Sequence, residues 1–264
     1  MAERSSSKVG ARARARRGHF APVSLLRVAA ILLLWALWEG AARSGWFYEG
    51  ALPSSFAIAS SGFHLLAQPD FYVNLGVTLF EIAAAVAIGS VLGISVGLAL
   101  GASRFAGKAF EPYVQYLAPA PKIIFLPVFM VLLGVDSSSK IAIGALSCFF
   151  PMALSVAAGV RQIDPVLLRV GRSFRLTPSQ TIAKIYLPAL TAPIATGLRL
   201  GLGVAIIGTL LSELQMSNSG LGFLIMQDYG RFDIAEMYAV LAMVFLLAAL
   251  ANGLIARGLR IKGR

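Results

Sequence analysis

Charged residues and cysteine are scarce in this chain, and each scarcity excludes a class of protein. Only 13% of the 264 residues are Asp, Glu, Lys or Arg, whereas 58% are hydrophobic. A water-soluble domain of this length needs far more surface charge, so the apolar excess is expected to face lipid. The single cysteine, Cys148, has no partner for an intrachain disulfide. The composition therefore predicts a membrane protein without disulfides.

The side chains that catalysis and metal binding require are also few. His19 and His64 are isolated, so no histidine metal site is expected. No serine, cysteine or paired-carboxylate constellation indicates a catalytic centre. The segment from Gly101 to Ala109 is similar to a phosphate-binding loop, but it has one residue too many and ends in Ala instead of Ser or Thr. We therefore predict no enzyme activity, no metal, no cofactor and no ATP site in this chain.

Long apolar runs predict an all-α, polytopic membrane protein with about six transmembrane helices. A helix needs about 20 apolar residues to cross the bilayer core, and continuous runs exclude the alternating strands of a barrel. The third run is interrupted by Pro119, Pro121 and Pro127, which predicts a broken or kinked helix. The predicted spans are Leu25–Ala42, Val73–Gly101, Leu117–Val135, Ile141–Val160, Ile194–Leu214 and Met237–Ala256.

Basic residues predict the orientation of these spans. The formal net charge of +11 would suggest a nucleic-acid partner in a soluble protein, but here Lys and Arg lie between the spans. With both termini in the cytoplasm, all but four of the 23 Lys and Arg fall in or beside cytoplasmic segments. The four exceptions are Arg43, Lys122, Lys140 and Arg231. We expect no nucleic-acid partner, and two basic cytoplasmic tails, a disordered one at residues 1–24 and a second at 257–264.

The N-terminal region has a second interpretation. Arginines before an apolar run are also typical of a cleaved signal, which would leave five spans. We favour a retained first helix, because it agrees with the charge pattern of the other segments. The segment 25–72 is then the first span followed by an outer loop.

Small residues and intramembrane charges mark further sites of interest. Glycines spaced by four residues favour close helix packing, and ordinary packing is the more general explanation for them. They are Gly89, Gly93, Gly97 and Gly101 in the second span, and Gly197 and Gly201 in the fifth. Glu39, Glu81 and Glu111 are interpreted as residues near helix ends that reach interface water. Glu213 is a candidate for the transport path, because charges at membrane depth are costly.

The loop between the fourth and fifth spans, residues 161–188, predicts two short amphipathic helices. Asp164 and Pro165 form a typical helix start, with the helix running to about Phe174. Thr177 and Pro178 start a second helix, which is expected to end at Leu187-Pro188. Such an elbow has a suitable shape for docking into a groove of a soluble partner.

This loop resembles the "EAA" loop of ABC importer permeases, in the branch associated with nitrate, sulfonate, taurine and bicarbonate uptake. Ile185, Leu187 and Pro188 match the family's loop ending, and Arg172-Ser173 also match. The Glu-Ala-Ala positions are instead Arg169, Val170 and Gly171, and the family's glycine is Arg175. These departures reverse a charge, so either the partner is adapted or this subunit couples differently.

Other segments extend the resemblance from about Leu52 to Ala256. Leu52-Pro53-Ser54, the segment from Pro121 to Pro127 with Gly134 and Lys140, and Ser219-Gly220-Leu221-Gly222 downstream of Glu213 are similar to family segments. Residues 73–256 would then be a type I importer permease domain. The resemblance implies two ATP-binding subunits at the 161–188 loop, a substrate-binding protein on the outer side, and a homodimer in the bacterial inner membrane that conducts a small anion. Lys122 and Glu213 are candidates for its path.

Two other classes remain open from the sequence. A secondary transporter or channel would carry ion-coupling charges near mid-span and an internal repeat, and neither is clear here. A membrane scaffold would explain the spans but not the two-helix loop.

Overall fold

The computed structural model describes residues 20–46 and 50–262, with side chains described for residues 25–46 and 50–254. Every regular element in these residues is a helix, which confirms the predicted all-α class. The predicted basic tails, 1–24 and 257–264, lie outside the residues whose side chains are described. The described residues up to Ser61 form one compact unit, and those from Gly62 onward form a second.

The first unit contains α2 (Phe20–Arg43) and the start of α3 (Ser55–Leu66). Two contacts hold the end of α2 to the turn that follows it. The Trp38 indole N–H donates to the Pro53 carbonyl at 3.2 Å, and the Ser55 amide donates to the Glu39 carboxylate at 3.0 Å. The segment 52–54, singled out in the sequence, is therefore the turn against which α2 ends.

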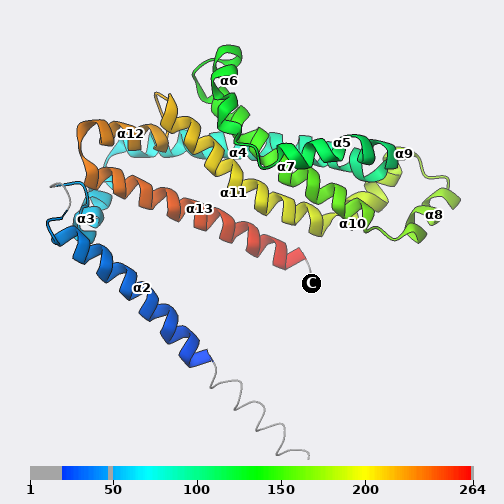
Figure 1. Cartoon of the computed structure of the whole chain (residues 1–264). Coiled ribbons are helices and arrows are strands. Elements are labelled where there is room, and N and C mark those ends of the chain that lie inside the picture. The colour runs from blue at the N-terminus through cyan, green and yellow to red at the C-terminus, as the bar shows by residue number, and fades with distance from the viewer. Residues whose placement is uncertain (1–19, 47–49, 263–264) are drawn as a thin grey trace, which may run out of the picture. The chain divides into compact units, whose positions relative to one another are not determined.

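Four long helices form the body of the second unit: α4 (Pro69–Ala102), α7 (Ser137–Arg161), α11 (Thr191–Gln215) and α13 (Ile234–Lys262). Figure 1 shows them as extended rods, with α11 beside both α7 and α13. With α2 they make five described helices that are long and apolar enough to cross a membrane, or six spans if one bent pair is counted. The prediction of about six spans is confirmed, and five of the predicted spans match helices to within a few residues.

The third predicted span is not one helix. An amphipathic helix α5 (Arg104–Leu117) ends before Pro119, and the chain then turns by 92° into the 3-10 helix η1 (Lys122–Phe125) and α6 (Leu126–Leu133). Pro119 and Pro121 cannot donate backbone hydrogen bonds and disfavour helix in the residues before them, so α5 stops there. The predicted break is confirmed, but the predicted bounds Leu117–Val135 are wrong, because η1 and α6 together extend only about 20 Å.

Several shorter helices connect the long ones. The predicted outer loop contains α3, and α12 (Leu221–Arg231) lies between α11 and α13; neither helix was predicted. The loop 161–188 holds α8 (Pro165–Ser173), α9 (Pro178–Thr181) and the π-helical segment η2 (Ile182–Tyr186), which leads into α10 (Leu187–Ala189). The second unit thus carries α12 at one end and α8 and α9 at the other (Figure 1).

The helix α7 packs between glycine faces of two neighbours. The structure places Gly89, Gly93, Gly97 and Gly101 of α4 against α7, where a Cβ on Gly97 would lie 2.6 Å from the Ala153 carbonyl oxygen. On α11, a Cβ on Gly201 would lie 2.7 Å from Cys148 Sγ. Since real Cβ atoms do not approach other atoms so closely, only glycine permits these helix separations.

Buried apolar side chains fill the space that this approach leaves. Met152, Val156 and Val160 are buried on α7, and they pack with Ile163 and with Leu190, which precedes α11. The core therefore continues from the helix bundle directly into the base of the 161–188 loop, so that loop is built on a rigid support.

Gly97→Ala is expected to lower the thermal unfolding temperature of the purified protein, since the new methyl group would collide with the α7 backbone. Overpacking of this kind costs about 1–3 kcal/mol, which outweighs the gain of less than about 1 kcal/mol from alanine's helix propensity. The matched control is Gly76→Ala in the same helix, where nothing lies within 4 Å of the new Cβ. Equal unfolding temperatures for the two variants in the same detergent would contradict the packing argument.

Candidate functional site

The first half of the 161–188 loop is a well-capped helix. Asp164 accepts a hydrogen bond from the Val166 amide at 2.8 Å, and Pro165 occupies the first turn of α8, where its missing N–H costs nothing. Gly171 is buried and packs against Ile185: a Cβ on Gly171 would lie 2.7 Å from Ile185 Cδ1. The predicted helix start at Asp164-Pro165 is confirmed, and Gly171 brings the two halves of the elbow into contact.

A left-handed residue ends α8. Arg175 has φ = 51°, and the Leu176 amide donates to the Gly171 carbonyl across the turn. This is the hydrogen-bond pattern of a helix C-terminus in which glycine normally occupies the left-handed position. Arg175 stands where the resemblance places the family's glycine, so this chain keeps the turn at a cost of about 1–2 kcal/mol.

The second half of the elbow ends close to the predicted stop, but by a different backbone path. Thr177 caps this helix as expected, in a capping box with Gln180, and the helical backbone continues through Leu187 and Pro188 to Ala189, the end of α10. Pro188 cannot donate to the carbonyl four residues earlier, and the π-helical segment Ile182–Tyr186 accommodates this missing bond. The helix thus ends at Ala189, one residue after the predicted stop, and only Leu190 separates the elbow from α11.

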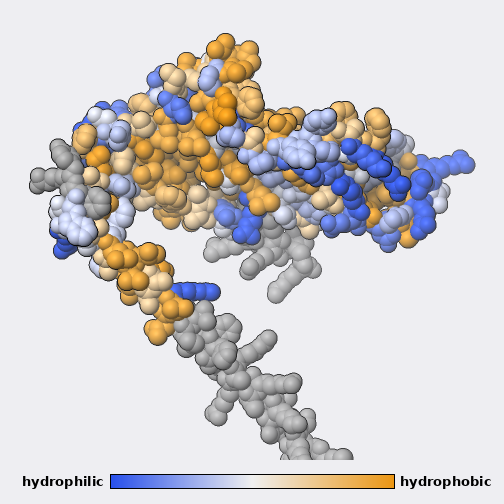
Figure 2. Space-filling view, viewed as in Figure 1, coloured by the Kyte–Doolittle hydropathy of each residue, from blue (hydrophilic) through white to orange (hydrophobic). Residues whose placement is uncertain are grey.

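The elbow exposes apolar and basic side chains together. On α8 and its C-cap, Val166, Val170 and Phe174 are spaced by four residues on one face, and Phe174 is 76% exposed. Arg169, Arg172 and Arg175 are exposed, and none has a carboxylate partner among the described residues. Figure 2 shows hydrophilic residues gathered over the end of the second unit that carries α8 and α9. Such a mixed surface is suited to docking a partner protein.

The opposite end of the bundle contains a buried polar arrangement that holds α12. Three consecutive amides at the start of α12 donate to side chains from other helices. Gly220 N–H bonds Asn74 at 2.7 Å, Leu221 N–H bonds Thr78 at 2.8 Å, and Gly222 N–H bonds Glu213 at 2.7 Å. We call Asn74, Thr78 and Glu213 the α12 cap.

Glu213 is fully occupied by this arrangement. It is 1% exposed, and its second oxygen accepts a hydrogen bond from the Thr78 hydroxyl at 2.7 Å. A Cβ on Gly220 or Gly222 would lie 2.5 Å from Glu213 atoms, which explains the glycines of the 219–222 segment. A carboxylate at a helix N-terminus is also electrostatically favourable. In this conformation Glu213 caps α12 and lines none of the described cavities, so its role on a transport path stays a prediction.

Two further charged side chains are buried close to Glu213. Glu81 is 1% exposed, and neither carboxyl oxygen has a hydrogen-bond partner among the described residues. The buried Lys140 lies within electrostatic range of both Glu81 and Glu213, and donates to the carbonyls of Val135 and Asp136. The interpretation that Glu81 reaches interface water is wrong, because it lies about three turns into α4 and its neighbours cover it. Glu39 and Glu111 form ion pairs with Arg43 and Arg161, and their contact with interface water stays a prediction.

Lys122 is placed differently from these buried charges. It lies in η1, directly after the break between α5 and α6, and is half-buried. Its ammonium group donates to the Ala118 carbonyl and lies 5.0 Å from the centre of the Phe150 ring. The carbonyl and the ring stabilise the cation without neutralising it.

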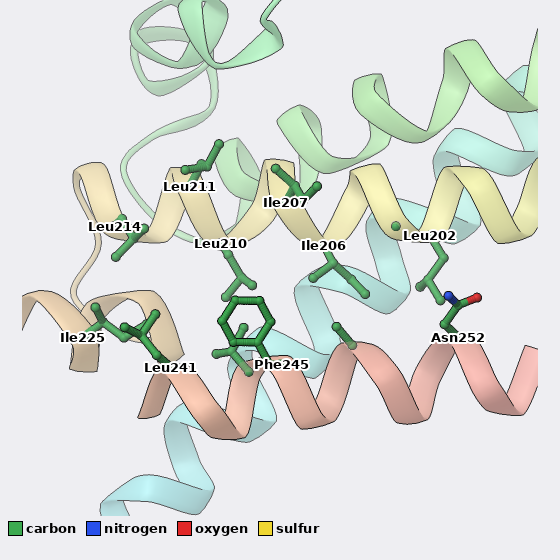
Figure 3. A pocket seen from close by; sticks show the side chains of 13 residues that line it. Leu202, Ile206, Ile207, Leu210, Leu211, Leu214, Ile225, Leu241, Phe245 and Asn252 are labelled. Atoms are coloured by element: carbon green, nitrogen blue, oxygen red, sulfur yellow. The ribbon is translucent and has the colours of Figure 1, made fainter. Parts of the chain in front are cut away.

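An apolar groove runs between α11 and α13. Figure 3 shows Leu210 and Phe245 pointing into it from the two helices, with Asn252 at one end. Its volume is about 430 Å³. The lining offers almost no polar groups, so this groove has the character of a lipid-facing surface and not of a site for a polar solute.

Comparison with known proteins places the chain in a family. Residues 89–258 match the model of the binding-protein-dependent transport system inner membrane component family. The chain belongs to this family. The match covers α7, the elbow, α11 and α12, and it supports a multi-pass protein of the inner membrane.

Curated relatives and a solved structure agree with this assignment. The permease is 31% identical over 191 residues to the aliphatic sulfonates transport permease protein SsuC of Bacillus subtilis (72% of this chain, 69% of the relative). It is 28% identical over 267 residues to the nitrate import permease protein NrtB of Synechocystis (96% and 95%), and 33% identical over 187 residues to the taurine transport system permease protein TauC of Escherichia coli (71% and 66%). A chain of the inward-facing MetNI methionine ABC transporter has the same fold, with a TM-score of 0.63 at 21% identity, covering 74% of this chain and 98% of that one.

These comparisons settle the class of the protein. The permease is of the ABC importer type, in the nitrate, sulfonate and taurine branch, as the sequence resemblance implied. The alternative of a secondary transporter or channel is therefore not retained. The family is one of transport permeases, not of enzymes.

Asp228 is the titratable group that stands out near the α12 cap. It lies in α12, is 5% exposed, and precedes the corner at which α13 begins. Burial raises the pKa of the Asp228 carboxyl from 3.8 to about 6, and the carboxylates of Glu236 and Asp233 act in the same direction, whereas Arg231 opposes them. The charged form is thus disfavoured in the folded protein.

Thr78→Val is expected to lower the unfolding temperature, because it leaves the Leu221 amide and one Glu213 oxygen without partners in a buried site. The expected cost is about 2–4 kcal/mol. Hydrogen exchange at the amides of residues 220–224 should increase locally. Thr196→Val is the control, since that exposed hydroxyl bonds only its own helix at Ala192. Unchanged exchange in Thr78→Val would show that the α12 cap does not hold α12.

Asp228→Asn is expected to stabilise the permease above pH 6. Because the pKa of Asp228 is raised in the folded state, the free energy of unfolding of the wild type falls as pH rises from about 4 to about 6. Above pH 6 it stays reduced by at most about 3 kcal/mol. The gain in unfolding temperature should therefore be full at pH 7 and shrink toward pH 4. Asp70→Asn, an exposed carboxylate at the start of α4, controls for the change in net charge. A pH-independent gain in Asp228→Asn would disprove the titration argument.

Proposed function

We propose that this permease forms, as a homodimer, the translocation path of an ATP-driven importer for a small anion. ATP hydrolysis takes place on two separate ATP-binding subunits, and a substrate-binding protein delivers the anion from outside. One chain with about six spans encloses too little space for a path, which supports a dimer around a two-fold axis. The three named relatives support the class of cargo, since they are permeases for sulfonates, nitrate and taurine.

The elbow is the proposed contact with the ATP-binding subunits. The observation that carries this proposal is the exposed face of α8, where apolar side chains lie beside Arg169 and Arg172, which have no carboxylate partner in the described part of the chain. Arg169 occupies the position of the family's glutamate, so the complementary surface on the ATPase is expected to be acidic or rich in carbonyls. Val170, Phe174 and Leu187 supply the apolar part of the contact.

The orientation follows from the distribution of charge. The α8 end carries Arg161, Arg169, Arg172, Arg175 and Lys184, and it is placed in the cytoplasm by the positive-inside rule. The α12 end is then on the outer side, where the binding protein docks. Both termini are cytoplasmic in this arrangement.

The junction between the elbow and α11 gives a route for coupling. Because η2 and α10 lead almost directly into α11, a rigid-body movement of the elbow would displace α11 relative to α4. ATP-driven closure of the two ATPase subunits would move both elbows, and would switch the path between inward-facing and outward-facing states. Pro188 shapes this junction through the π-helical segment.

Purification of the tagged permease from its native host in a mild detergent tests this proposal. The wild-type protein should retain a near-stoichiometric nucleotide-binding subunit, identified by mass spectrometry. Arg169→Glu should reduce the retained ATPase by about tenfold at low salt, because a charge that attracts would become one that repels. A higher salt concentration should weaken the wild-type complex and reduce the difference in retained ATPase between wild type and Arg169→Glu.

Arg104→Glu is the matched control, since it makes the same charge change at an exposed site on α5, outside the elbow. Isolation of the wild-type permease without any ATPase under several mild conditions would overturn the importer proposal. Equal retention by wild type and Arg169→Glu at both salt concentrations would overturn only the role of Arg169.

A further inference from the structure

A small cavity lies at the bend between α5 and α6. It has a volume of about 320 Å³ and is bounded by the α5–η1 turn, α7 and α11. Since a water molecule takes up about 30 Å³, this space holds a small solute with part of its hydration shell. Its lining residues are Ala118, Lys122, Ser147, Pro151, Leu154, Ser155, Leu200 and Val204.

Lys122 gives this cavity a positive charge. Among the described residues, no carboxylate lies within ion-pair distance of its ammonium group, and the cavity lining includes no acidic residue. One of its three N–H donors is used by the Ala118 carbonyl, which leaves two for a ligand. A half-buried cation in an apolar span without a counter-charge is costly, which makes Lys122 a candidate for a function.

The hydroxyl of Ser155 is the second donor at this cavity. It is half-buried, and makes no hydrogen bond to the protein among the described residues. Ser147, by contrast, donates to the Ile143 carbonyl of its own helix at 2.8 Å. The cavity therefore presents one ammonium group and one available hydroxyl.

The other span charges near the bundle core do not compete with Lys122 for an anion. Lys140 is 1% exposed and lies near Glu81 and Glu213, whose carboxylates attract its positive charge and leave less of it for an anion. Glu213 accepts two hydrogen bonds in the α12 cap and lines no part of this cavity. An anion that reaches the cavity meets positive charge and no nearby negative lining.

We propose that Lys122 and Ser155 form an anion-binding site on the translocation path, at which an oxyanion such as a sulfonate or nitrate is held during transport. This inference rests on the proposed importer function, and gives its cargo a location. The Lys122 ammonium would bind one anion oxygen as a charge-assisted donor, and Ser155 would bind another. One cation and one hydroxyl bind weakly enough for release, which conduction requires.

The test uses the complete importer, reconstituted in proteoliposomes with its ATPase and binding protein. ATP-dependent uptake of radiolabelled ethanesulfonate, taurine and nitrate is measured for wild type, Lys122→Gln, Lys122→Arg and Ser155→Ala. Lys122→Gln should reduce uptake of the transported anion by at least about tenfold, and Ser155→Ala by about threefold. Lys122→Arg should recover most of the uptake, because it retains the charge.

Two controls separate a binding role from a structural one. Ser95→Ala removes an exposed hydroxyl from α4 outside the cavity and should leave uptake unchanged. ATPase stimulation by the anion-loaded binding protein should persist in Lys122→Gln, which would show an assembled complex that hydrolyses ATP without moving the anion. Size-exclusion profiles equal to wild type would exclude misfolding.

The outcomes distinguish the two proposals. If wild type transports one of the anions and Lys122→Gln transports it equally well, the site is disproved and the importer function stands. The site is also disproved if Lys122→Arg is as defective as Lys122→Gln while both assemble, since charge would then be irrelevant. If wild type takes up none of the three anions, the proposed cargo class fails, and the anion site fails with it.

Discussion

The close approach of α4 and α11 to α7 is the constraint on which the rest of this permease depends. Glycines on both neighbours let their backbones lie against α7, which is therefore covered on two sides. Within lipid the hydrophobic effect does not drive helices together, so this association depends on close packing. The same three helices also support the elbow, the α12 cap and the Lys122 cavity. α7 and α11 continue into the two ends of the elbow, α4 and α11 supply the α12 cap, and α7 and α11 form two walls of the Lys122 cavity.

The charged side chains in and around these three helices differ in whether a neighbouring charge neutralises them. Near the α12 end, Glu81, Lys140 and Glu213 are buried together, and much of their charge is compensated within the protein. At the bend, Lys122 is stabilised by a carbonyl and a ring but keeps its charge. On the elbow, the arginines face outward. The same residue types therefore support structure at one end and, in the roles proposed above, cargo binding and subunit contact elsewhere, and the difference lies in what surrounds each charge.

Much of the fold could be predicted from the sequence, because membrane spans, breaks and helix caps are determined by residues that are neighbours in the chain. Five spans, the break near Pro119 and the caps at Asp164 and Thr177 depend on nearby residues alone, and these predictions agree with the structure. Features that depend on contacts between residues far apart in the sequence could not be predicted. The burial of Glu81 depends on helices far away in sequence, α12 is too short and polar to stand out, and Ser155 has meaning only beside Lys122. The π-helical segment Ile182–Tyr186, which accommodates Pro188 in a continuous helical run, was not predicted, because it depends on the hydrogen bonds of the folded backbone.

The shared burial of Glu81, Lys140 and Glu213 has a consequence for how the protein is made. These residues stand on α4, α7 and α11, which are synthesised one after another. When α4 emerges from the ribosome, neither Lys140 nor Glu213 exists yet, and a lone carboxylate in lipid is costly. Packing of α7 and α11 against α4 therefore removes a cost that α4 carries while Glu81 faces lipid alone, so the assembly of these three helices is coupled through their charges as well as through their glycines.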